Sequence, residues 1–144
     1  MPKKNMPFTP PFKLILFYLY LSIFGTALVV AMYVFASKET LFADYETLSS
    51  SEDLLRRVLT VAVSLISIVV TVWVKWLLRQ RRKDTLFAYA TLIFVNYGMF
   101  GIAPGTVTDL TLANALTVIV ALGIDFAILV FLFKSSQAIK TLSR

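Results

Sequence analysis

The sequence predicts an all-α membrane protein whose 144 residues form a single integral-membrane domain (1–144) of four transmembrane helices. The chain is 58% hydrophobic and 15% charged, whereas about 25% of residues are charged in an average soluble domain. Its apolar residues lie in four runs, most of them as long as the roughly 20 residues that cross a bilayer. Short polar segments separate the runs, so the helices are expected to form an antiparallel up-and-down bundle.

The first two runs predict long helices at about 12–36 and 54–78. The first follows a basic leader and ends with "VFA" before Ser37, which also resembles a cleaved signal peptide. An uncleaved span is the preferred interpretation, because the apolar core of a signal peptide has only about 7–15 residues. For the second helix, Ser51 is the expected N-cap, with Asp53 near the positive helix end.

The last two runs predict helices at about 86–103 and 110–133. The third helix is short, and the sequence "GIAPGT" is expected to end it. A re-entrant segment is the alternative, but it would reverse the side of everything downstream. We therefore expect a full span here, joined to the fourth helix by the segment 104–109.

The basic residues predict the orientation of this bundle. Eleven of the fourteen Lys and Arg residues fall on one side of the four-helix topology, and Lys38, Arg56 and Arg57 fall on the other. The positive-inside rule then places both termini and the loop 79–84 in the cytoplasm, with the loop 37–53 outside. The expected location is a bacterial cytoplasmic (inner) membrane.

The same distribution accounts for the net charge of +6 without a nucleic-acid partner. The expected partners are instead the lipid bilayer and either other membrane-protein subunits or further copies of this chain. Basic residues beside a membrane surface attract anionic lipids. The candidate contacts to lipid headgroups are Arg79, Arg81, Arg82 and Lys83.

One carboxylate, Asp125, lies inside the fourth apolar run, where a charge is costly. The second helix carries a polar stripe at helical spacing, formed by Thr60, Ser64, Ser67 and Thr71. This stripe predicts that the second and fourth helices touch and bury Asp125 between them. Asp125 would then accept a hydrogen bond from Thr71 or pair with Lys75. The candidate intramembrane polar cluster is Asp125, Lys75, Thr71, Asn114 and Ser67.

Asp125 has two competing interpretations. An ionisable residue inside a membrane is the usual sign of an ion or proton site. A lone buried acid can also be a polar anchor that fixes how helices pack. The anchor is preferred, because the spans contain no histidine and no second acid that would extend a relay.

The residue types limit the possible chemistry. The chain has no cysteine and no histidine, and it carries no phosphate-binding loop, nucleophile elbow or paired carboxylates. We therefore expect no enzyme and no catalytic, metal or cofactor site. The expected function is a non-catalytic membrane protein that binds other membrane proteins, as an accessory or assembly subunit or as an immunity-type inhibitor of a pore-former. The alternative is a homo-oligomeric ion channel or small transporter with Asp125 in its pathway.

Overall fold

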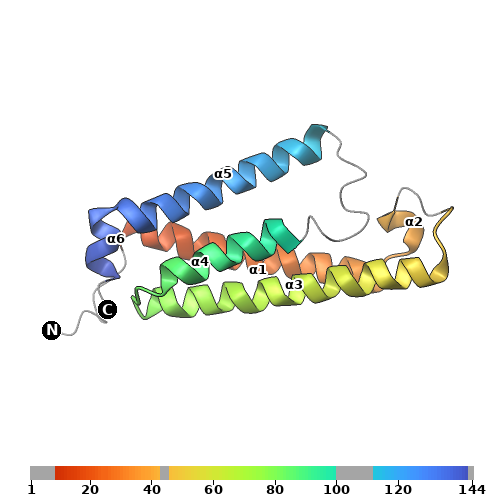
Figure 1. The fold of residues 1–144 in the computed structure, drawn as a ribbon, viewed down its shortest axis with the longest axis horizontal. Coiled ribbons are helices and arrows are strands. Elements are labelled where there is room, and N and C mark those ends of the chain that lie inside the picture. Colours follow the sequence, from red (N-terminus) through yellow and green to blue (C-terminus); the bar gives the residue numbers. More distant parts are fainter. Residues whose placement is uncertain (1–8, 43–45, 100–111, 143–144) are drawn as a thin grey trace.

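The computed structural model describes residues 9–42, 46–99 and 112–142. All regular structure in these residues is helical (Figure 1). The elements are α1 (Pro10–Phe35), α2 (Lys38–Leu41), α3 (Ser50–Arg79), α4 (Thr85–Ile93), the π-helix η2 (Phe94–Met99), α5 (Leu112–Lys134) and α6 (Ser136–Thr141).

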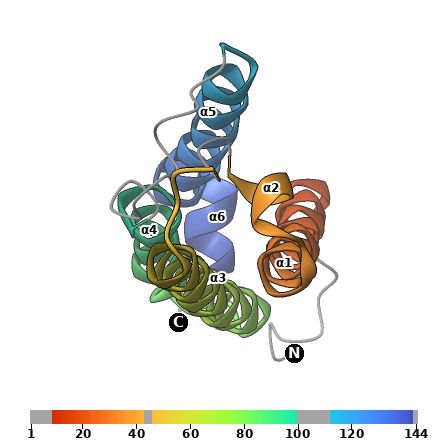
Figure 2. The same ribbon diagram turned by 90° about the vertical axis from the view of Figure 1, so that its right-hand side faces the viewer.

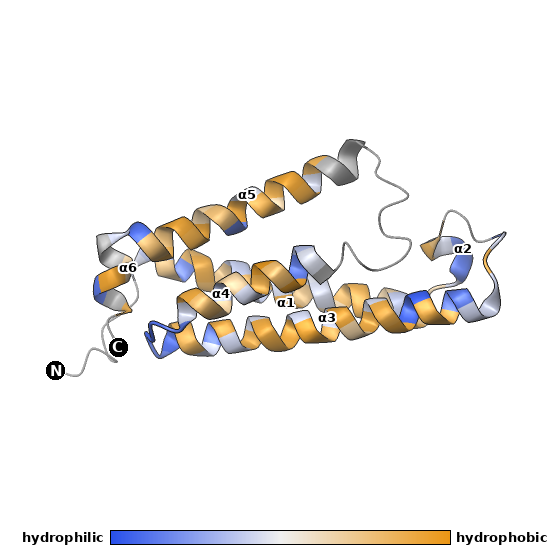
Figure 3. Ribbon diagram, viewed as in Figure 1, coloured by the Kyte–Doolittle hydropathy of each residue, from blue (hydrophilic) through white to orange (hydrophobic). Residues whose placement is uncertain are grey.

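Three of these helices are long and apolar enough to cross a bilayer: α1, α3 and the Leu116–Lys134 part of α5. Hydrophobic residues predominate along these three helices, with a few hydrophilic residues between them (Figure 3). The membrane class and the all-helical fold predicted from the sequence are therefore confirmed. The number of spans and the side on which each terminus lies stay predictions.

The third predicted helix differs from the expectation. Instead of one regular helix at 86–103, the chain forms the nine residues of α4 and continues as the six-residue π-helix η2. At about 1.5 Å per residue, a helix of this length covers well under the roughly 30 Å of a hydrocarbon core. Residues 100–103 and the "GIAPGT" segment lie outside the described residues.

The helices α1, α3, α4, α5 and α6 meet at one end of the bundle, whereas α2 lies at the other end (Figure 1). A single apolar cluster there joins the start of α1, the end of α3, the start of α4, the end of α5 and α6. Phe12, Leu78 and Tyr89 are completely buried in it, and Leu132 and Leu142 nearly so. This cluster fixes the ends of the helices, although α5 diverges from the bundle beyond it.

Along the bundle, α3 packs against α1 on one side and against α4 and η2 on another, while α5 packs against α4 and α6. The polar stripe of α3 is buried as expected, with Thr60, Ser64, Ser67 and Thr71 at most 4% exposed. The prediction that the fourth helix, α5, covers this stripe was wrong, because α1 and the α4–η2 segment pack against α3 instead.

Polar side chains stabilise the start of α3 and the end of α1, and the N-cap of α3 differs from the expected one. Ser49, and not Ser51, is the N-cap of α3, in a capping box with Glu52. This arrangement is favoured because Glu52 is three residues after Ser49, so it can bond back to the Ser49 N–H. Arg57 donates to the carbonyls of Tyr33 and Ala36 at the end of α1, at 3.1 and 2.7 Å. Its positive charge thereby stabilises the negative end of α1.

The N-terminal half of α5 leaves the bundle, as the views along and across the bundle both show (Figures 1 and 2). Five consecutive residues, 116–120, are exposed. Five residues of an α-helix cover more than one full turn of about 3.6 residues. Exposed residues therefore occur on every side of this stretch of α5 in the part of the chain that the structure describes.

Candidate functional site

Asp125 is the buried acid of the membrane-spanning helices, with 3% of its surface exposed. Its two carboxylate oxygens accept hydrogen bonds from two tyrosines, Tyr89 at 2.8 Å and Tyr97 at 2.7 Å. The side chain of Tyr18 on α1 also interacts with the carboxylate. Asp125 of α5 therefore bonds to the α4–η2 segment through both carboxylate oxygens, and Tyr18 of α1 lies near the same point.

The change from α4 to η2 positions the second tyrosine. Tyr89 and Tyr97 are eight residues apart, and a regular α-helix would turn residue 97 about 80° away from residue 89. The wider i→i+5 turns of a π-helix rotate each residue less. This brings Tyr97 back towards the face of Tyr89, and both hydroxyls reach the same carboxylate.

Asn96, the residue before Tyr97 in η2, bonds to α3. Ser67 of α3 donates a hydrogen bond of 2.5 Å to the Oδ1 atom of Asn96. Tyr97 points to α5 while Asn96 points to α3, so η2 forms a polar bridge between these two helices. π-Helical segments of this kind often occur at functional sites.

The polar stripe of α3 does not reach Asp125. The Thr71 hydroxyl donates to the Ser67 carbonyl one turn earlier in its own helix, at 2.7 Å. Lys75 places its Nζ atom 4.6 Å from the centre of the Tyr20 ring. The partners expected for Asp125, Thr71 and Lys75, are thus engaged elsewhere, and tyrosines take their place.

Of the five residues proposed as one polar cluster, the structure brings Ser67 and Thr71 together. Asp125 lies with the tyrosines, and Lys75 lies at the α1–α3 contact. Asn114 is in the first turn of α5, and its side chain lies outside the described residues. The sequence analysis missed the role of Tyr18, Tyr89 and Tyr97, although hydroxyl groups that can donate to a buried carboxylate were a usable signal.

The four basic residues proposed as lipid contacts lie in different surroundings. Arg79 donates to the Tyr20 hydroxyl at 2.6 Å, and Arg82 pairs with Asp84 at 2.8 Å. Arg81 is buried and has a φ of 57°, a backbone conformation uncommon for residues other than glycine. Lys83 is exposed, and among the described residues none forms an ion pair or hydrogen bond with its side chain.

Asp125 with Tyr18, Tyr89 and Tyr97 is called the Asp125 cluster here. A groove of about 550 Å³ runs between α1 and α5 beside this cluster. Apolar side chains dominate its walls, among them Phe17 of α1 and Ile128 of α5. Tyr18 lines this groove and also the smaller hollow next to it, along residues 116–124 of α5. Tyr18 therefore separates the groove from Asp125 and is part of both sites.

The long apolar helices, with their polar groups bonded to one another inside the bundle, define a helical integral membrane protein. Comparisons with protein-family models, with curated proteins and with solved structures give no match to this chain.

Proposed function

We propose that this chain is a non-catalytic protein of a bacterial cytoplasmic membrane that binds a transmembrane helix of another membrane protein. It would act as an accessory or assembly subunit, or as an immunity-type inhibitor of a pore-former. The proposal includes four spans with both termini in the cytoplasm, as the positive-inside rule predicts. The proposed binding place is the groove between α1 and α5.

The observation that carries this proposal is the position of the groove beside a polar cluster. Tyr18 interacts with Asp125 and is also part of the groove wall. Intramembrane polar residues normally face protein or water and avoid lipid chains. A helix from a partner would cover Tyr18 and would also pack along the exposed stretch 116–120 of α5.

The groove supports this proposal by its composition as well. Helices in lipid associate by close van der Waals packing and interhelical hydrogen bonds. The groove offers large apolar side chains, such as Phe17 and Phe131, next to a small one, Ala127. This unevenness gives a partner helix a place for its own side chains to fit between those of α1 and α5.

The test is purification from native membranes in a mild detergent, followed by mass measurement of the complex. Wild type is expected to carry a second, different membrane protein. Ala127→Trp fills the groove, and overpacking of about 1–3 kcal/mol should weaken that association by about 5- to 150-fold. Val69→Trp is the matched control, since Val69 is 68% exposed on α3 and lies away from the groove. Equal complex yields for both variants would contradict the proposal.

The second candidate function is a homo-oligomeric channel or small transporter. The observation that favours it is the meeting of a carboxylate and three tyrosine side chains inside the bundle, because such groups can hold an ion or a proton. Asp125→Asn keeps the size of the side chain and removes its charge. Ion flux through liposomes that wild type supports and this variant abolishes, with a closed homo-oligomer, would favour this candidate.

A further inference from the structure

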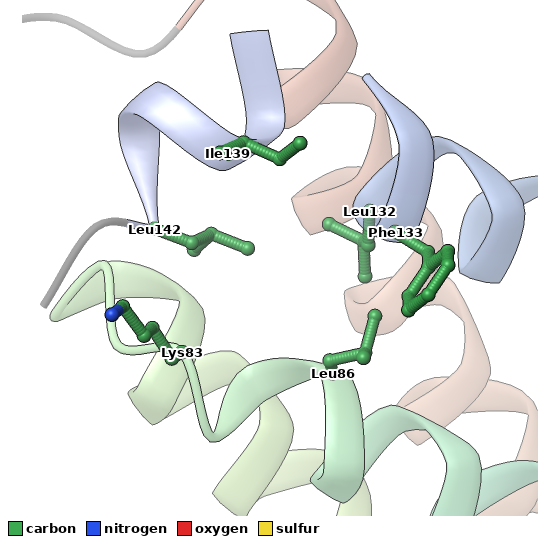
Figure 4. A pocket seen from close by; sticks show the side chains of 6 residues that line it. All are labelled: Lys83, Leu86, Leu132, Phe133, Ile139 and Leu142. Atoms are coloured by element: carbon green, nitrogen blue, oxygen red, sulfur yellow. The ribbon is translucent and has the colours of Figure 1, made fainter. Parts of the chain in front are cut away.

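A second pocket lies at the basic end of the bundle, outside the Asp125 cluster (Figure 4). It has a volume of about 190 Å³ and is formed by the start of α4, the end of α5 and the short helix α6. Its lining residues are Lys83, Leu86, Leu132, Phe133, Ile139 and Leu142. Five are apolar and one is a cation, so the pocket matches a ligand with an apolar body and an anionic head.

The depth of the pocket in the membrane follows from the helices that form it. Leu132 and Phe133 end the apolar run of α5, and Lys134 closes the helix. α6 then turns across the end of the bundle (Figures 1 and 2). The pocket is therefore at the boundary between hydrocarbon and headgroups, where a phospholipid has both its apolar chain and its phosphate.

We infer that this pocket binds one anionic phospholipid, with the phosphate at Lys83 and the upper part of one acyl chain between Leu132, Phe133 and Ile139. A dry apolar cavity of about 150 Å³ is large enough for benzene, so this pocket has room for several chain carbons. Lys83 is available for the phosphate, because no described residue neutralises it. Its neighbour Arg82 is held by Asp84.

Charge complementarity selects an anionic lipid over a neutral one. The same end of the bundle carries Lys13, Lys134 and Lys140, all exposed. These cations attract anionic headgroups in general, but they do not line the pocket. Among the described residues that line the pocket, Lys83 is the cation, so we expect the preference for an anionic headgroup to depend on it.

The test is a titration of the purified full chain in detergent with phosphatidylglycerol or phosphatidylcholine, with bound lipid counted by native mass spectrometry. The first phosphatidylglycerol is expected to bind more tightly than phosphatidylcholine. A lysine near an anionic surface strengthens lipid binding about five-fold, so Lys83→Gln should weaken the binding of the first phosphatidylglycerol by this factor. Lys83→Arg should restore it, and Lys13→Gln should leave it unchanged.

A second variant examines the apolar part of the pocket. Ile139→Trp fills the space beside Leu142 and retains every charge, so it should weaken phosphatidylglycerol and phosphatidylcholine together. Helix content by circular dichroism verifies that each variant is folded. Equal effects of Lys83→Gln and Lys13→Gln would overturn the inference. Competition by inorganic phosphate at the concentration of the lipid would also overturn it, because a free phosphate would then be the ligand.

Discussion

The hydrogen bonds between Asp125 and its tyrosines allow a quantitative prediction. Asp125→Leu removes the acceptor of two hydroxyls, from Tyr89 at 2.8 Å and Tyr97 at 2.7 Å. It also removes the cost of placing a carboxylate in a membrane helix, about 2.5–3.5 kcal/mol for a mid-helix Asp. The net effect of the single change is therefore small and uninformative. The informative quantity is the coupling between Asp125 and the tyrosine pair.

The coupling is measured by comparing Asp125→Leu in wild type with the same change in a Tyr89→Phe/Tyr97→Phe background. The cost of burying the carboxylate is the same in both backgrounds and cancels. Hydrogen bonds inside membranes average about 0.6 kcal/mol and reach about 1.7 kcal/mol. Both bonds here are short and accepted by a carboxylate, so we expect a coupling free energy of about 2 kcal/mol for the pair.

The assay is reversible unfolding in mixed micelles of a mild detergent and dodecyl sulfate, followed by far-ultraviolet circular dichroism. The control background is Tyr33→Phe, because the Tyr33 ring packs against Phe42 and away from Asp125. This background should show no coupling to Asp125. A coupling below about 0.5 kcal/mol for the Tyr89 and Tyr97 pair would refute the view that these hydroxyls hold α5 to the bundle.

Three further outcomes are expected. Arg57→Ala should lower the free energy of unfolding by about 1–2 kcal/mol in the same assay, since it removes charged donors from the carbonyls that end α1; an unchanged stability would contradict this. Ser67→Ala should destabilise by about 0.6 kcal/mol, whereas Ser64→Ala should be neutral or stabilising, because the buried Ser64 hydroxyl has no partner in the described part of the chain. Single cysteines should react with an impermeant reagent from outside at Ser50→Cys, and only after lysis at Lys140→Cys; labelling of Lys140→Cys in intact cells would reject the proposed topology.

The two halves of α5 differ in how firmly they pack against the other helices. Residues 116–120, on the N-terminal side of Asp125, are exposed in the described part of the chain, whereas Leu132 is buried in the apolar cluster at the other end of the helix. The two hydrogen bonds from Tyr89 and Tyr97 to Asp125 therefore restrain the motion of α5 relative to the α4–η2 segment. Partner binding in the groove and the integrity of these bonds should be coupled.

Composition and hydropathy determined the class of this protein. Apolar runs near 20 residues imply helices in a bilayer, because every backbone N–H and C=O must then be bonded within the segment. The spacing of the polar residues on α3 also predicted correctly that one face of this helix is buried. The first inference rests on the length of apolar runs and the second on helical periodicity, and the sequence contains both completely.

Only the tertiary structure decided which groups meet. Periodicity shows that Asp125 and the α3 stripe each lie on a definite face, but it does not show which helix covers that face. The π-helical turns of η2 rotate Tyr97 towards Asp125 and Asn96 towards Ser67, and no regular 3.6-residue spacing predicts that rotation. The partners of the buried carboxylate therefore depend on a local departure from the α-helix, and the position of α5 depends in turn on those partners.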